Sequence, residues 1–179
     1  MNNYNTLRGV GFVGNYPVGV YESEAEDLVR ACILRHIRQR DCPKVVTGLK
    51  TDFERLAIAQ TLRLKNEGAP VLLAVVGAFG HFLPLIRRPV EWAAKYGMPV
   101  NLSAQIDYKI LAGGKEDDLQ TASRIRTKLI LRHCHTVYVY YNDKQVPRDT
   151  LAHHFITLGL KDQTHVVNLF EPDDGDELR

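Results

Sequence analysis

Short apolar runs alternate with longer stretches of helical periodicity along the chain. Val10 to Val13 are apolar and precede a Gly-Asn-Tyr-Pro turn, which predicts a buried strand followed by a loop. The run from Pro70 to Val76 is apolar on both faces, as expected for a central parallel strand. The same pattern predicts strands over 10–13, 44–47, 70–76, 108–111, 136–141 and 165–169. Apolar residues at helical spacing predict helices over 23–37, 51–66, 90–96, 117–132 and 148–158.

Local signals mark several of the predicted helix ends. Ser23-x-x-Glu26 and Thr51-x-x-Glu54 both have the pattern of a capping box, which satisfies free amides at a helix start. Asn66-Glu67-Gly68 and Gly97 are typical of helix C-termini.

Strands separated by helices predict right-handed βαβ units. We therefore expect a single α/β domain of Rossmann type over residues 1–170, in three layers, with a mostly parallel sheet of five to seven strands. Residues 171–179 form an acidic tail that we expect to be flexible. Ligands of such sheets bind at the carboxyl ends of the strands. The loops at that edge are predicted to be 14–23, 47–54, 77–88, 112–118, 141–150 and the segment after 169.

The composition is that of an ordinary soluble globular protein. The chain has 179 residues, of which 45% are apolar and 25% charged. Its 23 Lys and Arg against 21 Asp and Glu give a net charge of +2, which argues against nucleic acid or an anionic membrane as a partner. No apolar run reaches the ~20 residues of a membrane helix, and the N-terminus lacks a secretory signal pattern. Three cysteines without a CxxC pattern favour a reducing, cytoplasmic compartment.

Four segments, taken in order, resemble motifs of one protein family. Val10 to Pro17 is similar to a "FTGHRP" start, and Thr47 to Ala57 is similar to a Gly-Gly…Gly-x-Asp-x-x-Ala loop after the second strand. Arg126 to Val137 looks like an "RN-x-x-MV-x-x-SD-x-L" segment, and Asp149-Thr150 stands where a Gly-Thr opens a helix. Together they resemble the SLOG superfamily, Rossmann-like relatives of the LOG phosphoribohydrolases and of DNA-processing protein A, over residues 9 to 170.

The resemblance implies a nucleotide or NAD- or ADP-ribose-derived ligand, and it implies a homodimer. The implied ligand-binding positions are Gly14, Asn15, Tyr16, Gly48, Leu49, Glu54, Arg126, Asp149 and Thr150. Of these, Gly14, Asn15, Gly48 and Glu54 would approach the ribose or base, and Arg126 and Thr150 would meet phosphate. The resemblance implies a degenerate member, because residues 144–150 stand in place of the Gly-Gly-Thr loop whose amides would cradle a phosphate. No LOG-type catalytic loop is present.

The residues themselves leave alternatives open at these positions. Gly14 and Gly48 are equally suited to plain strand-to-helix turns. Glu54 either meets a ribose hydroxyl or forms half of a capping box, and Arg126 either binds phosphate or is a solvated helix arginine. Thr150 is either a phosphate ligand or a helix cap.

The segment after the central strand carries glycines and aromatic residues. Gly77 and Phe79 belong to a loop on which an adenine or other ring could stack, or they form a buried hydrophobic plug. Trp92 and Tyr96 either cover that ring or pack on the sheet, and the neighbouring pair Arg87-Arg88 is either solvated or meets a phosphate.

Neither a metal nor a cofactor is predicted. His133, Cys134 and His135 adjoin a helix end, but adjacent residues point in different directions and do not form one ligand set. Tyr138 and Tyr140 share one face of a strand and are predicted to pack on the sheet.

Three functions follow as hypotheses. The first is binding of a nucleotide-like ligand in a sensing or sequestering role. The second is an enzyme that cleaves an N-glycosidic or phosphoribosyl bond, with Glu54 as the catalytic carboxylate. The third is a protein-interaction scaffold whose pocket has closed.

Overall fold

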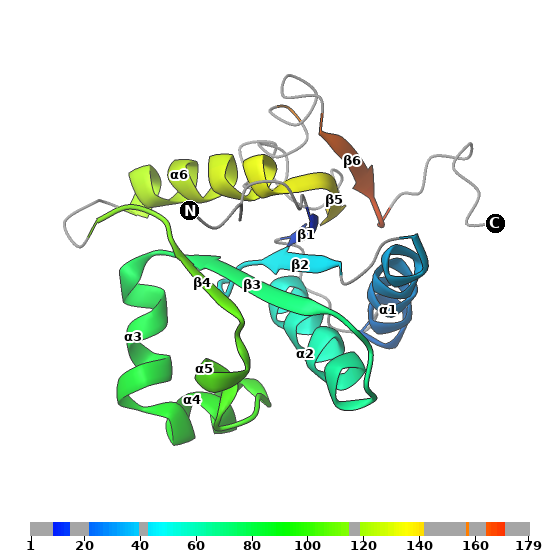
Figure 1. The fold of residues 1–179 in the computed structure, drawn as a ribbon. Coiled ribbons are helices and arrows are strands. Elements are labelled where there is room, and N and C mark those ends of the chain that lie inside the picture. The colour runs from blue at the N-terminus through cyan, green and yellow to red at the C-terminus, as the bar shows by residue number, and fades with distance from the viewer. Residues whose placement is uncertain are drawn as a thin grey trace, which may run out of the picture.

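A parallel sheet forms the centre of the computed structural model (Figure 1). The structure describes residues 9–14, 22–39, 43–114, 119–141, 157 and 164–170. Within them six strands pair in the order β4-β3-β2-β1-β5-β6, and every pair is parallel. The strands are β1 (Gly9–Gly14), β2 (Lys44–Thr47), β3 (Leu72–Gly77), β4 (Tyr108–Leu111), β5 (Cys134–Tyr140) and β6 (His165–Asn168). The predicted Rossmann-like α/β sheet is confirmed.

Helices cover both faces of this sheet. They are α1 (Glu22–Gln39), α2 (Asp52–Asn66), α3 (Phe79–Arg87), α4 (Pro89–Tyr96), α5 (Leu102–Gln105) and α6 (Leu119–His133). In Figure 1, α6 lies on one side of the sheet, and α1 and α2 lie on the other, with α3, α4 and α5 beside them below β3 and β4. The described part of the chain is therefore a three-layer structure.

The alternation of side chains along β3 shows how the two layers of core arise. Leu73 and Val75 are fully buried in the cluster that includes α1 and α2, whereas Ala74 and Val76 are fully buried in the cluster that includes α6. Because successive strand residues point to opposite faces, a strand buried on both must be apolar at every position. This explains the continuous apolar run that predicted the strand.

Tyr138 and Tyr140 pack in the sheet as predicted. The ring of Tyr138 stacks on Phe12 with centroids 5.3 Å apart, and Tyr140 stacks on Phe53 at 5.1 Å. Both tyrosines are buried. They therefore contribute to the core and offer no open aromatic platform.

The predicted boundaries of the described elements agree with the structure to within two residues, but two local predictions are wrong. Gly68 and Gly97 have positive φ, of 87° and 62°, at the ends of α2 and α4 as their positions predicted. Ser23, however, lies inside the first turn of α1, which begins at Glu22. The predicted loop over 77–88 is wrong, because Phe79–Arg87 forms α3 with Phe82 and Leu85 turned into the core.

Some predictions fall outside the described residues. These are the helix over 148–158, of which only Thr157 is described and is helical, and the tail over 171–179. None of the helices that the structure describes is both long and apolar enough to cross a membrane.

Candidate ligand site at the carboxyl ends of the strands

Glu54 closes the N-terminus of α2 directly after β2. Its Oε2 accepts hydrogen bonds from the backbone N–H of Lys50 at 2.8 Å and of Thr51 at 3.2 Å, while Thr51 Oγ1 accepts one from the Glu54 N–H at 3.3 Å. The predicted capping box is thus present in full. The Glu54 side chain is completely buried, so this carboxylate belongs to the interior of the described structure.

Arg126 reaches the same carboxylate from the opposite layer of the fold. Its Nη2 contacts Glu54 Oε1 in an ion pair whose two side chains are 3% and 0% exposed. Burial lowers the pKa of the Arg126 guanidinium to about 10, so it stays protonated at neutral pH. The pair links α6 on one face of the sheet to α2 on the other, across the end of β2.

Gly48 lies directly against this ion pair. A Cβ at this position would overlap Arg126 Nη2 and would stand 2.5 Å from Glu54 Oε2. A side chain here would therefore displace one of the two charged groups. The glycine is explained by the close approach of the buried pair.

Several buried nitrogens near this pair have no hydrogen-bond partner among the described residues. They are Nε and Nη1 of Arg126 and Nδ1 of His81. All three belong to residues that line one small cavity, together with Lys50, Ala78, Ala122 and Ser123. Ala78 is the N-cap of α3, so the cavity also lies at a helix N-terminus, where the dipole favours negative charge.

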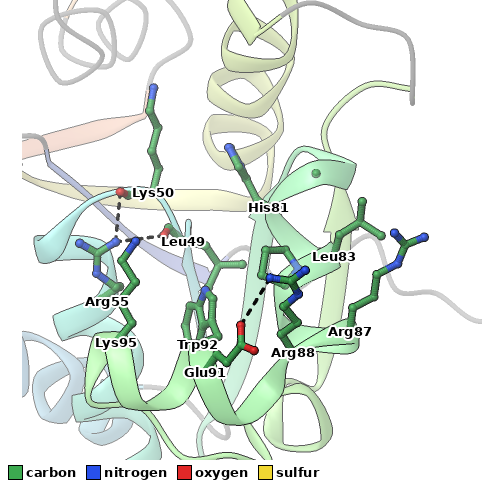
Figure 2. Close-up of a pocket in the computed structure, with 12 residues that line it drawn as sticks. Leu49, Lys50, Arg55, His81, Leu83, Arg87, Arg88, Glu91, Trp92 and Lys95 are labelled. Atoms are coloured by element: carbon green, nitrogen blue, oxygen red, sulfur yellow. Dashed lines mark hydrogen bonds and ion pairs between the residues drawn. The ribbon is translucent and has the colours of Figure 1, made fainter.

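A second, larger pocket adjoins the first and has a volume of about 580 Å³. This volume falls within the range of small-molecule sites. The apolar part of its wall is formed by Leu49, Leu83, Pro84 and Trp92. Its charged side chains come from the β2–α2 junction and from α2, α3 and α4 (Figure 2), and are Lys50, Arg55, Arg87, Arg88, Lys95 and Glu91.

The cations of the larger pocket differ in how they are held. Arg55 donates to the Lys50 carbonyl at 3.2 Å and pairs with Asp52, and Arg88 pairs with Glu91 at 3.6 Å. The side chains of Lys50 and Arg87 make no hydrogen bond or ion pair with another described residue. With five cations against one carboxylate, the pocket is strongly positive.

His81 stands where the two cavities meet, since it lines both. Partial burial, and to a smaller degree the charge of Lys50, lower the pKa of His81 below its usual range. The neutral form of the imidazole is therefore favoured. In Figure 2, His81 and Lys50 point to the side of the pocket away from Trp92.

The structure brings four of the predicted ligand-binding residues together: Gly48, Leu49, Glu54 and Arg126. Two predicted glycines contact aromatic rings. A Cβ at Gly14 would lie 3.0 Å from Phe53 Cδ1, and one at Gly77 would lie 3.1 Å from Phe82 Cε2.

Other predicted positions lie elsewhere. Phe79 is the first residue of α3. Asn15, Tyr16, Asp149 and Thr150 lie outside the described residues.

Sequence reasoning did not select Lys50, Arg55, Lys95 or Ser123. One pattern in the sequence could have indicated the larger pocket: Arg88, Trp92 and Lys95 are spaced by four and three residues and so share one helix face. Among the described residues no group of three or more His, Cys, Asp or Glu is arranged to hold a metal ion.

No protein-family model and no curated protein sequence matches the chain. The structure is similar to that of DNA processing protein A (DprA) from Streptococcus pneumoniae, with a TM-score of 0.59 and 13% sequence identity. The match covers 93% of this chain and 51% of the other, so the chain spans about half the length of that protein. This likeness supports the Rossmann-like fold that the resemblance to the SLOG superfamily implies.

The comparison corrects one prediction. Net charge led us to argue against nucleic acid as a partner, but the protein of similar structure is a DNA processing protein. The argument was wrong because +2 is a sum over the whole chain, whereas the larger pocket alone combines five cations with one carboxylate. The charge of this protein is segregated, and composition does not show that.

Proposed function

We propose that the chain is a SLOG-type domain that binds a nucleotide or a NAD- or ADP-ribose-derived ligand at the carboxyl ends of its strands. In this proposal one phosphate oxygen enters the small cavity between Arg126, His81, Lys50 and Ser123. The observation that carries it is the set of buried Arg126 and His81 nitrogens without a hydrogen-bond partner among the described residues.

Unpartnered buried donors make such a site costly when it is empty. Each one costs roughly 1–3 kcal/mol, and more when the donor is charged. An oxyanion would accept charge-assisted hydrogen bonds from the Arg126 guanidinium, which are among the strongest in proteins. The small cavity has room for only about one water-sized group, which suits a single phosphate oxygen with the rest of the ligand outside.

Binding is favoured over turnover by the surroundings of Glu54. Its Oε1 contacts Arg126, its Oε2 accepts two backbone hydrogen bonds, and the side chain is fully buried. A carboxylate engaged in this way is poorly placed to attack a sugar or to accept a proton. We assign Glu54 to holding Arg126 and the loop after β2. Release of free base from a nucleoside monophosphate, lost in Glu54→Gln, would instead support the enzyme.

A second candidate ligand is single-stranded nucleic acid. It is favoured by the cationic larger pocket and by the likeness in fold to a DNA-processing protein. Nucleotides and single strands present the same phosphate chemistry, so the same site serves both hypotheses.

The test is thermal stability of the full chain with a panel of nucleotides, ADP-ribose, NAD and a single-stranded oligonucleotide. A ligand at about 100 times its Kd stabilises by about 2.7 kcal/mol, which gives a clear shift. We expect Lys50→Ala and Ser123→Ala to reduce that shift. Lys128→Ala, which removes an exposed lysine of α6 outside both cavities, is the matched control. The absence of any stabilising ligand at millimolar concentration would reject the proposal.

The predicted homodimer is tested separately, by light scattering coupled to size-exclusion chromatography. A monomer at all concentrations would remove that part of the prediction.

A further inference from the structure

We infer that the larger pocket is a second anion-binding subsite for the same ligand, so that the ligand carries two separated phosphates, as a dinucleotide does, rather than one. This inference rests on the proposed function, because it takes the small cavity beside Arg126 as the first subsite. It adds the ligand class and the residues that select it.

The two cavities share part of their lining. Lys50 and His81 belong to both, and each cavity then continues in a different direction. The small one extends to α6, where it meets Ser123 and Arg126. The larger one extends along α3, where it meets Arg87, to α4, which contributes Trp92 and Lys95. The two cavities are therefore adjacent, and a ligand seated in the first subsite would extend past Lys50 and His81 to reach the second.

Arg87, at the C-terminal end of α3, is attached well away from His81, which lies near the start of that helix and lines both cavities. His81 and Arg87 are six residues apart on α3, which corresponds to about 9 Å along the helix axis. In Figure 2, Arg87 and Arg88 lie on one side of Trp92, and Arg55 and Lys95 on the other. We therefore assign Arg87 and Arg88 to the second subsite, and Lys50, His81 and Arg126 to the first.

At least two of these cations can turn to an incoming anion. Arg87 is exposed and makes no hydrogen bond or ion pair with another described residue. Arg88 pairs with Glu91 at 3.6 Å, but both side chains are 73% exposed. Such a surface pair is weak, so a phosphate replaces Glu91 as the partner of Arg88 at little cost. Arg55, in contrast, is fixed by Asp52 and the Lys50 carbonyl.

Part of the lining of the larger pocket is apolar, and Trp92 lies between Arg87 and Arg88 on one side and Arg55 and Lys95 on the other (Figure 2). Leu49 and Trp92 are 7% and 9% exposed, and Leu83 and Pro84 complete the lining. A surface of this kind suits the flat base or the sugar that joins two phosphates. An inorganic polyphosphate would gain nothing from it. The inference therefore names a nucleotide ligand with two phosphates.

The experiment compares ligands that differ by one nucleotide. Isothermal titration calorimetry of the full chain would measure AMP against the 5′-phosphorylated dinucleotide pApA, and UMP against pUpU. We expect the dinucleotide to bind at least about tenfold more tightly than its monophosphate, the gain of one charge-assisted contact. The Arg87→Ala variant should lose about tenfold in dinucleotide affinity and keep its affinity for the monophosphate.

The control is Arg124→Ala, which removes an equal charge from an exposed position on α6 outside both cavities. It should bind both ligands as the wild type does. The slope of log affinity against log salt for the dinucleotide should fall by about one in Arg87→Ala and stay unchanged in Arg124→Ala.

The outcomes separate the inference from the proposed function. Equal affinity for monophosphate and dinucleotide, or an equal loss of both in Arg87→Ala, overturns the second subsite and leaves the first. A failure of every nucleotide to bind rejects both. A series of oligonucleotides of increasing length, titrated in parallel, identifies the source of the two phosphates. Affinity that keeps rising beyond pApA indicates a segment of a single strand, and affinity that levels off at pApA indicates a free dinucleotide; either result supports the second subsite.

Discussion

Replacing Arg126 with methionine tests whether the buried ion pair organises the carboxyl edge of the sheet. The substitution keeps a long side chain in the space but leaves the Glu54 carboxylate, which is fully buried, without its cation. Removing one partner of a buried ion pair costs about 3–5 kcal/mol, because the remaining charge stays desolvated. Since a domain is stable by only about 5–15 kcal/mol, the loss is a large fraction of the total.

A second substitution, at Glu54, should restore part of the lost stability, provided that the two backbone hydrogen bonds to this side chain keep an acceptor. Glu54→Gln removes the negative charge but keeps an oxygen that can accept from the Lys50 or Thr51 N–H. The double variant Glu54→Gln/Arg126→Met should therefore be more stable than Arg126→Met alone, by about 2 kcal/mol or more. The corresponding drop in Tm for the single variant is roughly 6–20 °C for a chain of this size.

Urea denaturation of the wild type, both single variants and the double variant gives the complete cycle. Arg124→Met, an exposed arginine on the same helix, serves as control and should lie within about 0.5 kcal/mol of the wild type. A loss below about 1 kcal/mol in Arg126→Met, or a double variant no more stable than that single variant, would refute the reasoning.

Three further predictions follow from the same region. Gly48→Ala should destabilise the fold by more than about 2 kcal/mol in urea denaturation, because its Cβ would overlap Arg126. Gly80 is a helical position with nothing within 4 Å of a new Cβ, so Gly80→Ala should be neutral or stabilising by up to about 1 kcal/mol. Equal effects of the two substitutions would contradict the account of Gly48. Thr51→Ala should cost about 1 kcal/mol by the same measurement, through loss of the cap of α2, and no loss would mean that the cap contributes nothing. The lowered pKa of His81 means that its neutral form is favoured by folding, so its contribution to stability is present above the unfolded pKa near 6.5 and is lost as the pH falls through the folded pKa. A bound phosphate should raise that pKa, so that affinity increases from pH 7.5 to 6 with proton uptake in calorimetry, and His81→Gln should abolish this dependence.

Local signals in the sequence were sufficient for much of the fold. The capping box of Thr51 and Glu54 spans four residues, so it depended on nothing distant and was predicted correctly. The contact between Glu54 and Arg126 joins residues 72 positions apart, and only the parallel sheet order brings their elements together. The sequence therefore suggested both residues but not that they neutralise each other.

The helix α3 shows where local signals misled. Gly77, Gly80 and Pro84 within eight residues are typical of a loop. In the structure Gly77 ends β3, and burial of Phe82 and Leu85 against the core stabilises a helix that propensity alone does not favour. Missing α3 also concealed the larger pocket, because His81 and Arg87 line it only as members of that helix.

The same pocket explains why net charge is a poor guide to the local charge that a ligand would meet. Its five cations come from the β2–α2 junction and from α2, α3 and α4, so they form no basic run that a reading of the sequence would detect. With one carboxylate among them, the pocket accounts for more positive charge than the net +2 of the whole chain, and the remainder is on balance negative. At physiological salt, charges act over a Debye length of about 8 Å, so a ligand in the pocket responds to the local group and not to the distant acidic residues. A near-neutral chain can therefore bind a polyanion, provided that the fold gathers its cations in one place.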